Sequence, residues 1–319
     1  MVRVEYSCLI VNTMKKIIVI SYFFITSFTC MSQDVNFLMD NQNPIYSNPA
    51  FTGTIKNFRF VYAYRNENFI NFSMITHYMS ADQYLGKIGG VGLSYLSDTQ
   101  LDIYTSNIIS INYAKSISLG KNGRLSFGAS GSLHQENIDL SKLSFGDYFN
   151  LRRGFIYTNQ VNTYNSTVNN FDFNLGFLFY QNNFYFGYAA HHITQPNISF
   201  FESASPLTRK HVIQTGFKIK LNEYTELLPI GDARLQDYFI YLSGMLQLKC
   251  KWIIAGVGYG DNSSIFGMLG VTFDQWRLLY SYGYISTKLT NQLESNHEIS
   301  LQMLLNLSKK ENKNLFLVY

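Results

Sequence analysis

The pair His297-Glu298 is the place in this chain of 319 residues that most invites a metal or acid–base interpretation. A helical zinc-protease motif needs a second histidine at position 301, which is Leu301 here. The flanking residues alternate as in a strand, so neighbouring side chains point to opposite faces and do not meet at one ligand. We expect a structural role, in which Glu298 or His297 pairs with an arginine.

The remaining histidines and the cysteines offer no better set of ligands. The same alternation argues against His191-His192 as a metal site. The other histidines are scattered along the chain, at His77, His134 and His211. Three cysteines cannot form a four-ligand zinc site or a disulfide framework. We therefore expect no metal and no other cofactor.

A candidate nucleophile is equally hard to find. The glycine- and serine-rich stretch 128–132 has the wrong spacing for a Gly-x-Ser-x-Gly motif, and it lies in a predicted strand rather than a strand–turn–helix. No glycine-rich phosphate loop opens a helix. We expect no catalytic residues, and hence a protein that is not an enzyme.

The composition excludes several classes of protein. Charged residues make up 14% of the chain, against roughly 25% in an average soluble domain. Hydrophobic residues reach 46% and aromatic residues 16%, which argues against both a disordered chain and an ordinary cytosolic enzyme. The net charge is +4 with no basic run longer than two residues, so nucleic-acid binding is not expected.

The N-terminal residues resemble an export signal. Met14-Lys15-Lys16 precedes an apolar run from Ile17 to Phe28. A short, more polar segment from Thr29 to Gln33 follows, as in a secretory signal peptide. We interpret residues 14–32 as that signal and residues 1–13 as lying upstream of the true start. The alternative is a lipidated N-terminus at Cys30.

The rest of the chain alternates with a period of two, which predicts strands of about ten residues with one large apolar face and one small or polar face. The predicted strands lie near 56–65, 68–80, 87–97, 105–117, 123–135, 170–180, 183–192, 210–221, 237–249, 251–260, 264–273, 276–285 and 295–308, with a fourteenth in 137–149 or at the tail. The longer gaps at 137–168, 193–209 and 222–236 are interpreted as loops.

Export, strand length and abundant tyrosine and phenylalanine favour an all-β, antiparallel transmembrane barrel over a soluble sandwich. We predict about 14 strands over residues 56–319, with 12 as the alternative, and a short N-terminal plug or mouth segment at 33–55. Charged strand residues are expected in the lumen, because an arginine or lysine facing lipid costs about 2–4 kcal/mol at mid-depth and an acidic residue costs somewhat less. These are Arg59, Arg65, Arg277, Asp172 and Glu298.

The segment Asn43-Pro44-Ile45-Tyr46-Ser47-Asn48-Pro49-Ala50-Phe51-Thr52-Gly53 resembles the Asn-Pro-Ala-aromatic-x-Gly opening of the PorP/SprF family of the type IX secretion system. Further matches are Arg59 and Arg65, Asp172-Phe173, His191 to Asn197, Leu228-Pro229, Tyr280-Ser281-Tyr282, and His297-Glu298 with its flanking residues. Asn48-Pro49 restricts the backbone before the barrel and Gly53 permits a sharp turn.

The resemblance implies a non-enzymatic outer-membrane component of type IX secretion in a Bacteroidota-type organism, with a link to gliding motility. The implied partners are outer-membrane lipid, large secreted cargo such as adhesins with C-terminal sorting domains, and periplasmic components of the machine. The alternative is an outer-membrane transporter or porin for small solutes, since a fold does not determine a function.

Overall fold

A computed structural model describes residues 34–55, 57–69, 72–142, 149–150, 154–155, 166–200, 205–260, 264–285 and 294–305. The predicted signal peptide, residues 1–13 and Cys30 lie outside these residues. The barrel belongs to one compact unit, Val35–Tyr319. Within the described ranges, no helix is long and apolar enough to cross a membrane.

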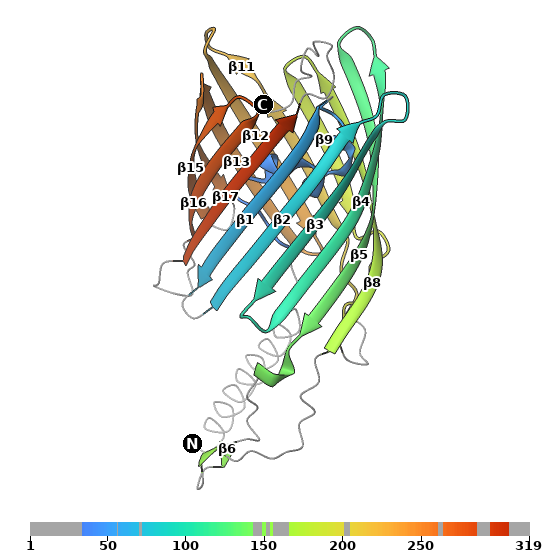
Figure 1. The fold of residues 1–319 in the computed structure, drawn as a ribbon, viewed down its shortest axis with the longest axis vertical. Coiled ribbons are helices and arrows are strands. Elements are labelled where there is room, and N and C mark those ends of the chain that lie inside the picture. Colours follow the sequence, from blue (N-terminus) through green and yellow to red (C-terminus); the bar gives the residue numbers. More distant parts are fainter. Residues whose placement is uncertain are drawn as a thin grey trace, which may run out of the picture. The chain divides into compact units, whose positions relative to one another are not determined.

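Fourteen antiparallel strands form a closed ring (Figure 1). In ring order they are β1 Phe58–Phe69, β2 Phe72–Tyr84, β3 Gly90–Gln100, β4 Tyr104–Leu119, β5 Gly123–Ile138, β8 Ser166–Gln181, β9 Phe184–His191, β10 Lys210–Phe217, β12 Thr225–Gln236, β13 Phe239–Cys250, β14 Ile253–Gly260, β15 Ser264–Phe273, β16 Trp276–Ile285 and β17 Glu294–Leu305. The ring closes where β1 pairs with β17 and where β10 pairs with β12. The predicted fold, a barrel of fourteen antiparallel strands, is confirmed.

The remaining elements are short. Among the described residues, three short helices precede the barrel: η1 Asp40–Gln42, α2 Pro44–Ser47 and η2 Pro49–Phe51. A fourth, η3 Leu140–Lys142, follows β5. β6 Phe149–Asn150 pairs with β7 Gly154–Phe155, and β11 Ile219–Lys220 extends the sheet beside β12.

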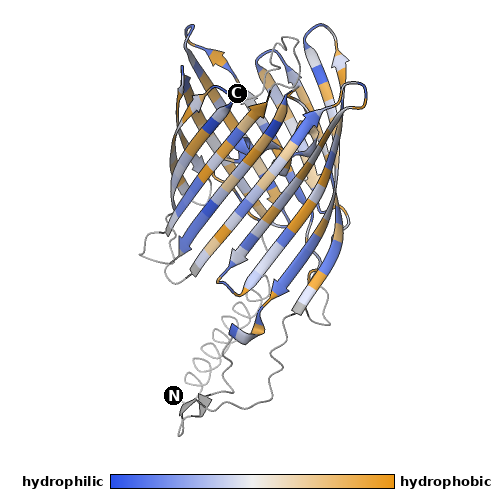
Figure 2. Cartoon of the chain, in the orientation of Figure 1, coloured by the Kyte–Doolittle hydropathy of each residue, from blue (hydrophilic) through white to orange (hydrophobic). Residues whose placement is uncertain are grey.

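The alternation places apolar side chains outside and polar ones inside the barrel. In β4, Ile109 and Ile111 are 54% and 67% exposed, whereas Asn112 is 2% exposed. Figure 2 shows this mixture of apolar and polar residues along the strands. Such an inverted surface suits a barrel surrounded by hydrocarbon, because the lipid supplies the apolar environment that a soluble protein finds in its core.

The connections differ between the two ends of the barrel. The three longest connections, 139–165, 192–209 and 286–293, follow β5, β9 and β16, and these strands all finish at the same end of the barrel, because neighbouring strands of the antiparallel ring run in opposite directions. The opposite end has the shorter turns 120–122, 182–183, 251–252 and 274–275, and it is where β1 begins.

The expectation of a loop over 222–236 is wrong, because β12 occupies Thr225–Gln236. Pro229 argued against a strand in this segment, since proline has no N–H to donate to the hydrogen bonds between strands. The structure places Pro229 where the neighbour of β12 changes: Ile230 pairs with β10 and Leu227 pairs with β11. A missing N–H is tolerated at such a break, so the strand continues through the proline.

Candidate functional site

Residues 35–55, which we call the plug, precede β1 and contact inward-facing residues of the barrel. Figure 1 shows this blue segment inside the ring of strands. Three plug side chains are buried against separate groups of wall residues. Phe37 packs with Ala63, Tyr78 and Leu96; Met39 packs with Met245, Ile254, Phe266, Met268 and Leu279; Phe51 packs with Leu178, Tyr180, Tyr185 and Leu228. Each buried side chain contributes about 1.5–3 kcal/mol to docking.

Arg59 and Asp82 form a buried ion pair that also holds the end of the plug. The Arg59 Nε donates to Asp82 Oδ1 at 2.7 Å, and its guanidinium also donates to the Phe51 carbonyl at 3.1 Å. The Gly53 N–H donates to Asp82 Oδ2 at 2.7 Å. The first two strands therefore recognise the plug backbone, independently of its side chains.

Glu298 of β17 binds the beginning of the plug. Its carboxylate accepts the backbone N–H groups of Leu38 and Met39 at 2.5 and 3.0 Å. The Arg65 Nε lies 3.8 Å from Glu298 Oε1, and Arg65 also pairs with Glu67. Glu298 thus lies beside an arginine, as its predicted structural role requires. In addition, it binds the backbone of the plug.

Arg234 of β12 anchors the middle of the plug. Its guanidinium lies 2.8 Å from Asp40 Oδ2 and 2.9 Å from Asp232 Oδ2, and it donates to Asn36 Oδ1 at 2.8 Å. Burial raises the pKa of Asp40 to about 6, although Arg234 acts in the opposite direction. Two carboxylates share one guanidinium here, so proton binding at Asp40 relieves repulsion.

Asn48 joins the plug to the opposite wall. Its Oδ1 accepts the Ala50 N–H at 2.9 Å and caps η2, while its Nδ2 donates to the carbonyls of Phe177 and Tyr188 at 3.0 and 3.3 Å. Pro49 opens η2, where a missing N–H has no cost. The family motif therefore forms a turn that fits between β8 and β9.

Two glycines are required by close backbone approach. A Cβ on Gly128 of β5 would lie 2.3 Å from the Ala50 nitrogen, so a side chain there would displace the plug. Gly53 has a φ of +65°, and its Cβ would lie 2.3 Å from Gly90 Cα. The plug thus reaches the wall at positions where only glycine leaves room.

Asp172 lies in a second polar group, at the long-loop end. Its Oδ2 is 2.7 Å from His192 Nδ1 and 3.7 Å from His134 Nε2, and its Oδ1 accepts from Thr194 Oγ1 at 2.6 Å. His191 and His192 do not point to opposite faces as expected, since both side chains are buried. They have different partners, because His191 Nε2 lies 3.0 Å from the Ser47 carbonyl whereas His192 Nδ1 contacts Asp172. His192 follows the last residue of β9 with a φ of +56°, which turns its side chain away from the outward position.

Ser132 stands 3.2 Å from His134 Nε2, but this is not a catalytic triad. The same nitrogen faces both Ser132 and Asp172, whereas a triad histidine uses one nitrogen for each. The arrangement is a hydrogen-bonded cluster with donor atoms suited to a cation.

His297 points to the other face from Glu298. Its Nδ1 lies 2.8 Å from the Tyr280 hydroxyl on the outside of the barrel. His77 and His211 make the same contact with Tyr62 and Tyr188, at 3.0 and 2.8 Å. These amphipathic pairs suit a membrane interface, where tyrosine is enriched.

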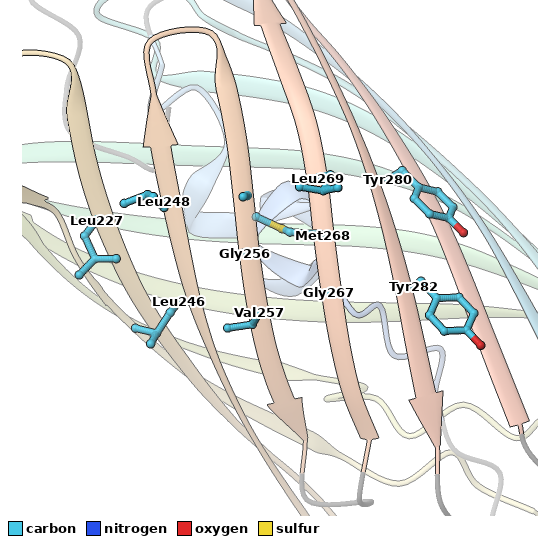
Figure 3. A pocket seen from close by; sticks show the side chains of 11 residues that line it. Leu227, Leu246, Leu248, Gly256, Val257, Gly267, Met268, Leu269, Tyr280 and Tyr282 are labelled. Carbon is cyan, nitrogen blue, oxygen red and sulfur yellow. The ribbon is translucent and has the colours of Figure 1, made fainter.

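The outer face also carries an apolar depression of about 580 Å³ across β12 to β16 (Figure 3). Leu246, Leu248, Val257 and Leu269 line it, with Tyr280 and Tyr282 at one side. Its lining is almost wholly apolar, which matches the hydrocarbon that surrounds a membrane barrel.

Three residues of the plug contacts were not among the predicted site residues: Asp40 of the plug, and Asp82 and Arg234 of the wall. Arg234 lies in the missed strand β12, so its inward position could not be read from alternation. Asp82 lies two residues beyond the predicted end of its strand, where continuing the alternation from Ser80 would have placed it inside.

A family model described as type IX secretion system membrane protein PorP/SprF matches residues 30–303. No match was found among functionally curated proteins. Among solved structures, the CymD monoaromatic hydrocarbon channel has a TM-score of 0.50 at 9% identity, covering 88% of this chain and 96% of that chain. The Ralstonia pickettii toluene transporter TbuX has a TM-score of 0.48 at 9% identity, covering 82% and 93%. Omp33 of Acinetobacter baumannii has a TM-score of 0.44 at 6% identity, covering 78% and 99%.

At such low identities the structural likeness shows the fold alone, that of an outer-membrane barrel. Both this fold and a secretion-system membrane protein are non-enzymatic types. The family match spans nearly all of the barrel together with the plug. This chain therefore belongs to the PorP/SprF family of type IX secretion system membrane proteins.

Proposed function

We propose that this protein is a non-enzymatic component of the type IX secretion system in the outer membrane. It assists the secretion or surface attachment of large cargo, such as adhesins with C-terminal sorting domains, and so contributes to gliding motility in a Bacteroidota-type cell. The family match over residues 30–303 carries this proposal. Export by the signal peptide at 14–32 is part of it.

The docked plug favours an anchor over a conduit. It is held at three polar sites, on Asp82, Glu298 and Arg234, and at three apolar sites on the wall. Passage of a protein through the lumen would require all of these contacts to break. We infer that cargo meets the outside of the barrel, with the plug in place.

The two ends of the barrel suit different partners. Outer-membrane barrels have short turns on the periplasmic side and longer loops outside the cell. We assign the long connections 139–165, 192–209 and 286–293 to the cell surface, where they meet cargo. The opposite end, where the plug leads into β1, faces periplasmic components of the machine.

Deletion of the gene, followed by quantitative proteomics of the medium and cell surface, tests the proposal. We expect a few proteins with C-terminal sorting domains to leave the surface, and the wild-type gene to restore them. A matched gene in which 192–209 is replaced by a short glycine–serine linker should insert in the membrane but fail to restore cargo. Unchanged secretion in the deletion strain would refute the secretion role and leave solute transport, to be measured as flux in liposomes.

A further inference from the structure

The group formed by His134, Asp172 and His192, which we call the His–Asp–His cluster, has the composition of a metal site. The three residues come from β5, from β8 and from the position directly after β9. Their side chains are 2%, 0% and 6% exposed. One possible ligand atom from each lies within 4.8 Å of the other two, so a single ion can reach all three.

The donor atoms suit a divalent transition metal, and zinc in particular. Two imidazole nitrogens and one carboxylate oxygen are a ligand set that zinc commonly uses, with the fourth position left for water or another oxygen. The Ser132 hydroxyl lies 3.2 Å from His134 Nε2, nearer to that nitrogen than the Asp172 carboxylate oxygen at 3.7 Å. Zinc ligands are usually oriented by further hydrogen bonds, and Thr194 Oγ1 donates to Asp172 Oδ1 at 2.6 Å.

The backbone around the cluster is organised to hold it. The His192 N–H donates to Asn174 Oδ1 at 3.0 Å, and the Ile193 N–H donates to the Phe173 carbonyl at 3.0 Å. These bonds hold the residue after β9 against β8, in the left-handed conformation that turns His192 inward. A fully buried carboxylate also needs a compensating positive charge, which a zinc ion or a protonated histidine supplies.

We propose that the His–Asp–His cluster binds one Zn²⁺ ion. The ion would join the beginning of the connection 192–209 to β5 and β8. The neighbouring His191 Nε2 lies 3.0 Å from the Ser47 carbonyl of the plug, so the same point of the wall supports both the plug and this loop. Zinc would then stabilise the position of a long loop. This proposal is independent of the secretion role.

Measuring the zinc content of the purified full chain in detergent micelles tests the proposal. The protein is treated with a chelator, equilibrated with Zn²⁺, desalted and analysed by mass spectrometry of the metal. Affinity is measured by competition with a chromophoric chelator. We expect about one zinc per chain and a loss of affinity of at least about tenfold in His134→Gln and in His192→Gln. His211→Gln, on the outer face, is the matched control and should bind zinc normally.

A second measurement covers the case in which these variants do not fold. Co²⁺ bound to the wild-type protein should show the visible absorption of a site with nitrogen ligands, and Zn²⁺ should abolish it. Zn²⁺ should also raise the unfolding temperature of the wild type and of His211→Gln. A folded wild-type barrel that retains far less than one zinc overturns the proposal, as does equal binding by His134→Gln. In either case the cluster is a hydrogen-bonded structural group.

Discussion

Glu298 is the wall residue whose replacement should release the beginning of the plug with the least disturbance to the barrel. It accepts two backbone N–H groups, from Leu38 and Met39. Glu298→Gln keeps the shape and one acceptor oxygen but replaces the other oxygen by a donor. One of the two plug N–H groups then faces an NH₂ group in a buried site.

The size of the effect follows from these two bonds. A hydrogen bond to a charged group contributes about 1.5–3 kcal/mol, and a buried donor left without a partner costs about 1–3 kcal/mol. We therefore expect the free energy of docking of residues 35–42 to fall by about 2 kcal/mol, which corresponds to roughly a 30-fold larger released population.

Hydrogen–deuterium exchange of the plug measures this population directly. In micelles or nanodiscs, peptides containing Leu38 and Met39 should exchange about 30-fold faster in Glu298→Gln than in the wild type. His297→Gln is the matched control, because the neighbouring side chain contacts Tyr280 on the outer face. Unchanged exchange in Glu298→Gln, or equal acceleration in His297→Gln, would refute the role assigned to Glu298.

Three further predictions concern the plug. Asn48→Ala removes the cap of η2 and two hydrogen bonds to the barrel wall. The free energy of unfolding, measured in urea, should therefore fall by about 1–3 kcal/mol. An unchanged urea concentration at the unfolding midpoint would contradict this. Gly128→Ala should expose residues 35–55 to limited proteolysis, because its Cβ would meet the Ala50 nitrogen at 2.3 Å, whereas Gly267→Ala, with open space around its Cβ, should not. Burial raises the pKa of Asp40 from 3.8 to about 6 among Arg234, Asp232, Lys210 and Glu298, so the docked plug binds a proton more tightly than the released plug. Its docking should strengthen as the pH falls from 7 toward 4. Asp40→Asn should weaken this dependence, measured at pH 5 and pH 7 by the protection factor of the plug amides, which is the ratio of the intrinsic to the observed exchange rate. Equal pH dependence of the protection factor in both proteins would rule Asp40 out as its origin.

The barrel could be predicted because its signal is local. The period of two places Ile109 and Ile111 on one face of the strand and Asn112 on the other, and this placement does not depend on the rest of the chain. Inward placement of Arg59, Arg65, Asp172 and Glu298 follows from the same alternation and from the cost of a charge in lipid. The pattern failed at Pro229, where strand pairing with two different neighbours overrides a residue that disfavours strands.

The partners of the inward residues depend on register and chain direction, which a single strand does not contain. The sequence by itself determined a membrane barrel of about fourteen strands with a polar lumen and an N-terminal segment outside the strand pattern. Only the tertiary structure decided that Glu298 accepts hydrogen bonds from Met39 and Leu38, which lie 259 and 260 positions earlier in the chain. It also decided that His134, Asp172 and His192 converge, because this requires the register of β5 on β8 and one left-handed residue after β9. Contacts of this kind are set by closure of the ring, and ring closure is a property of the whole chain.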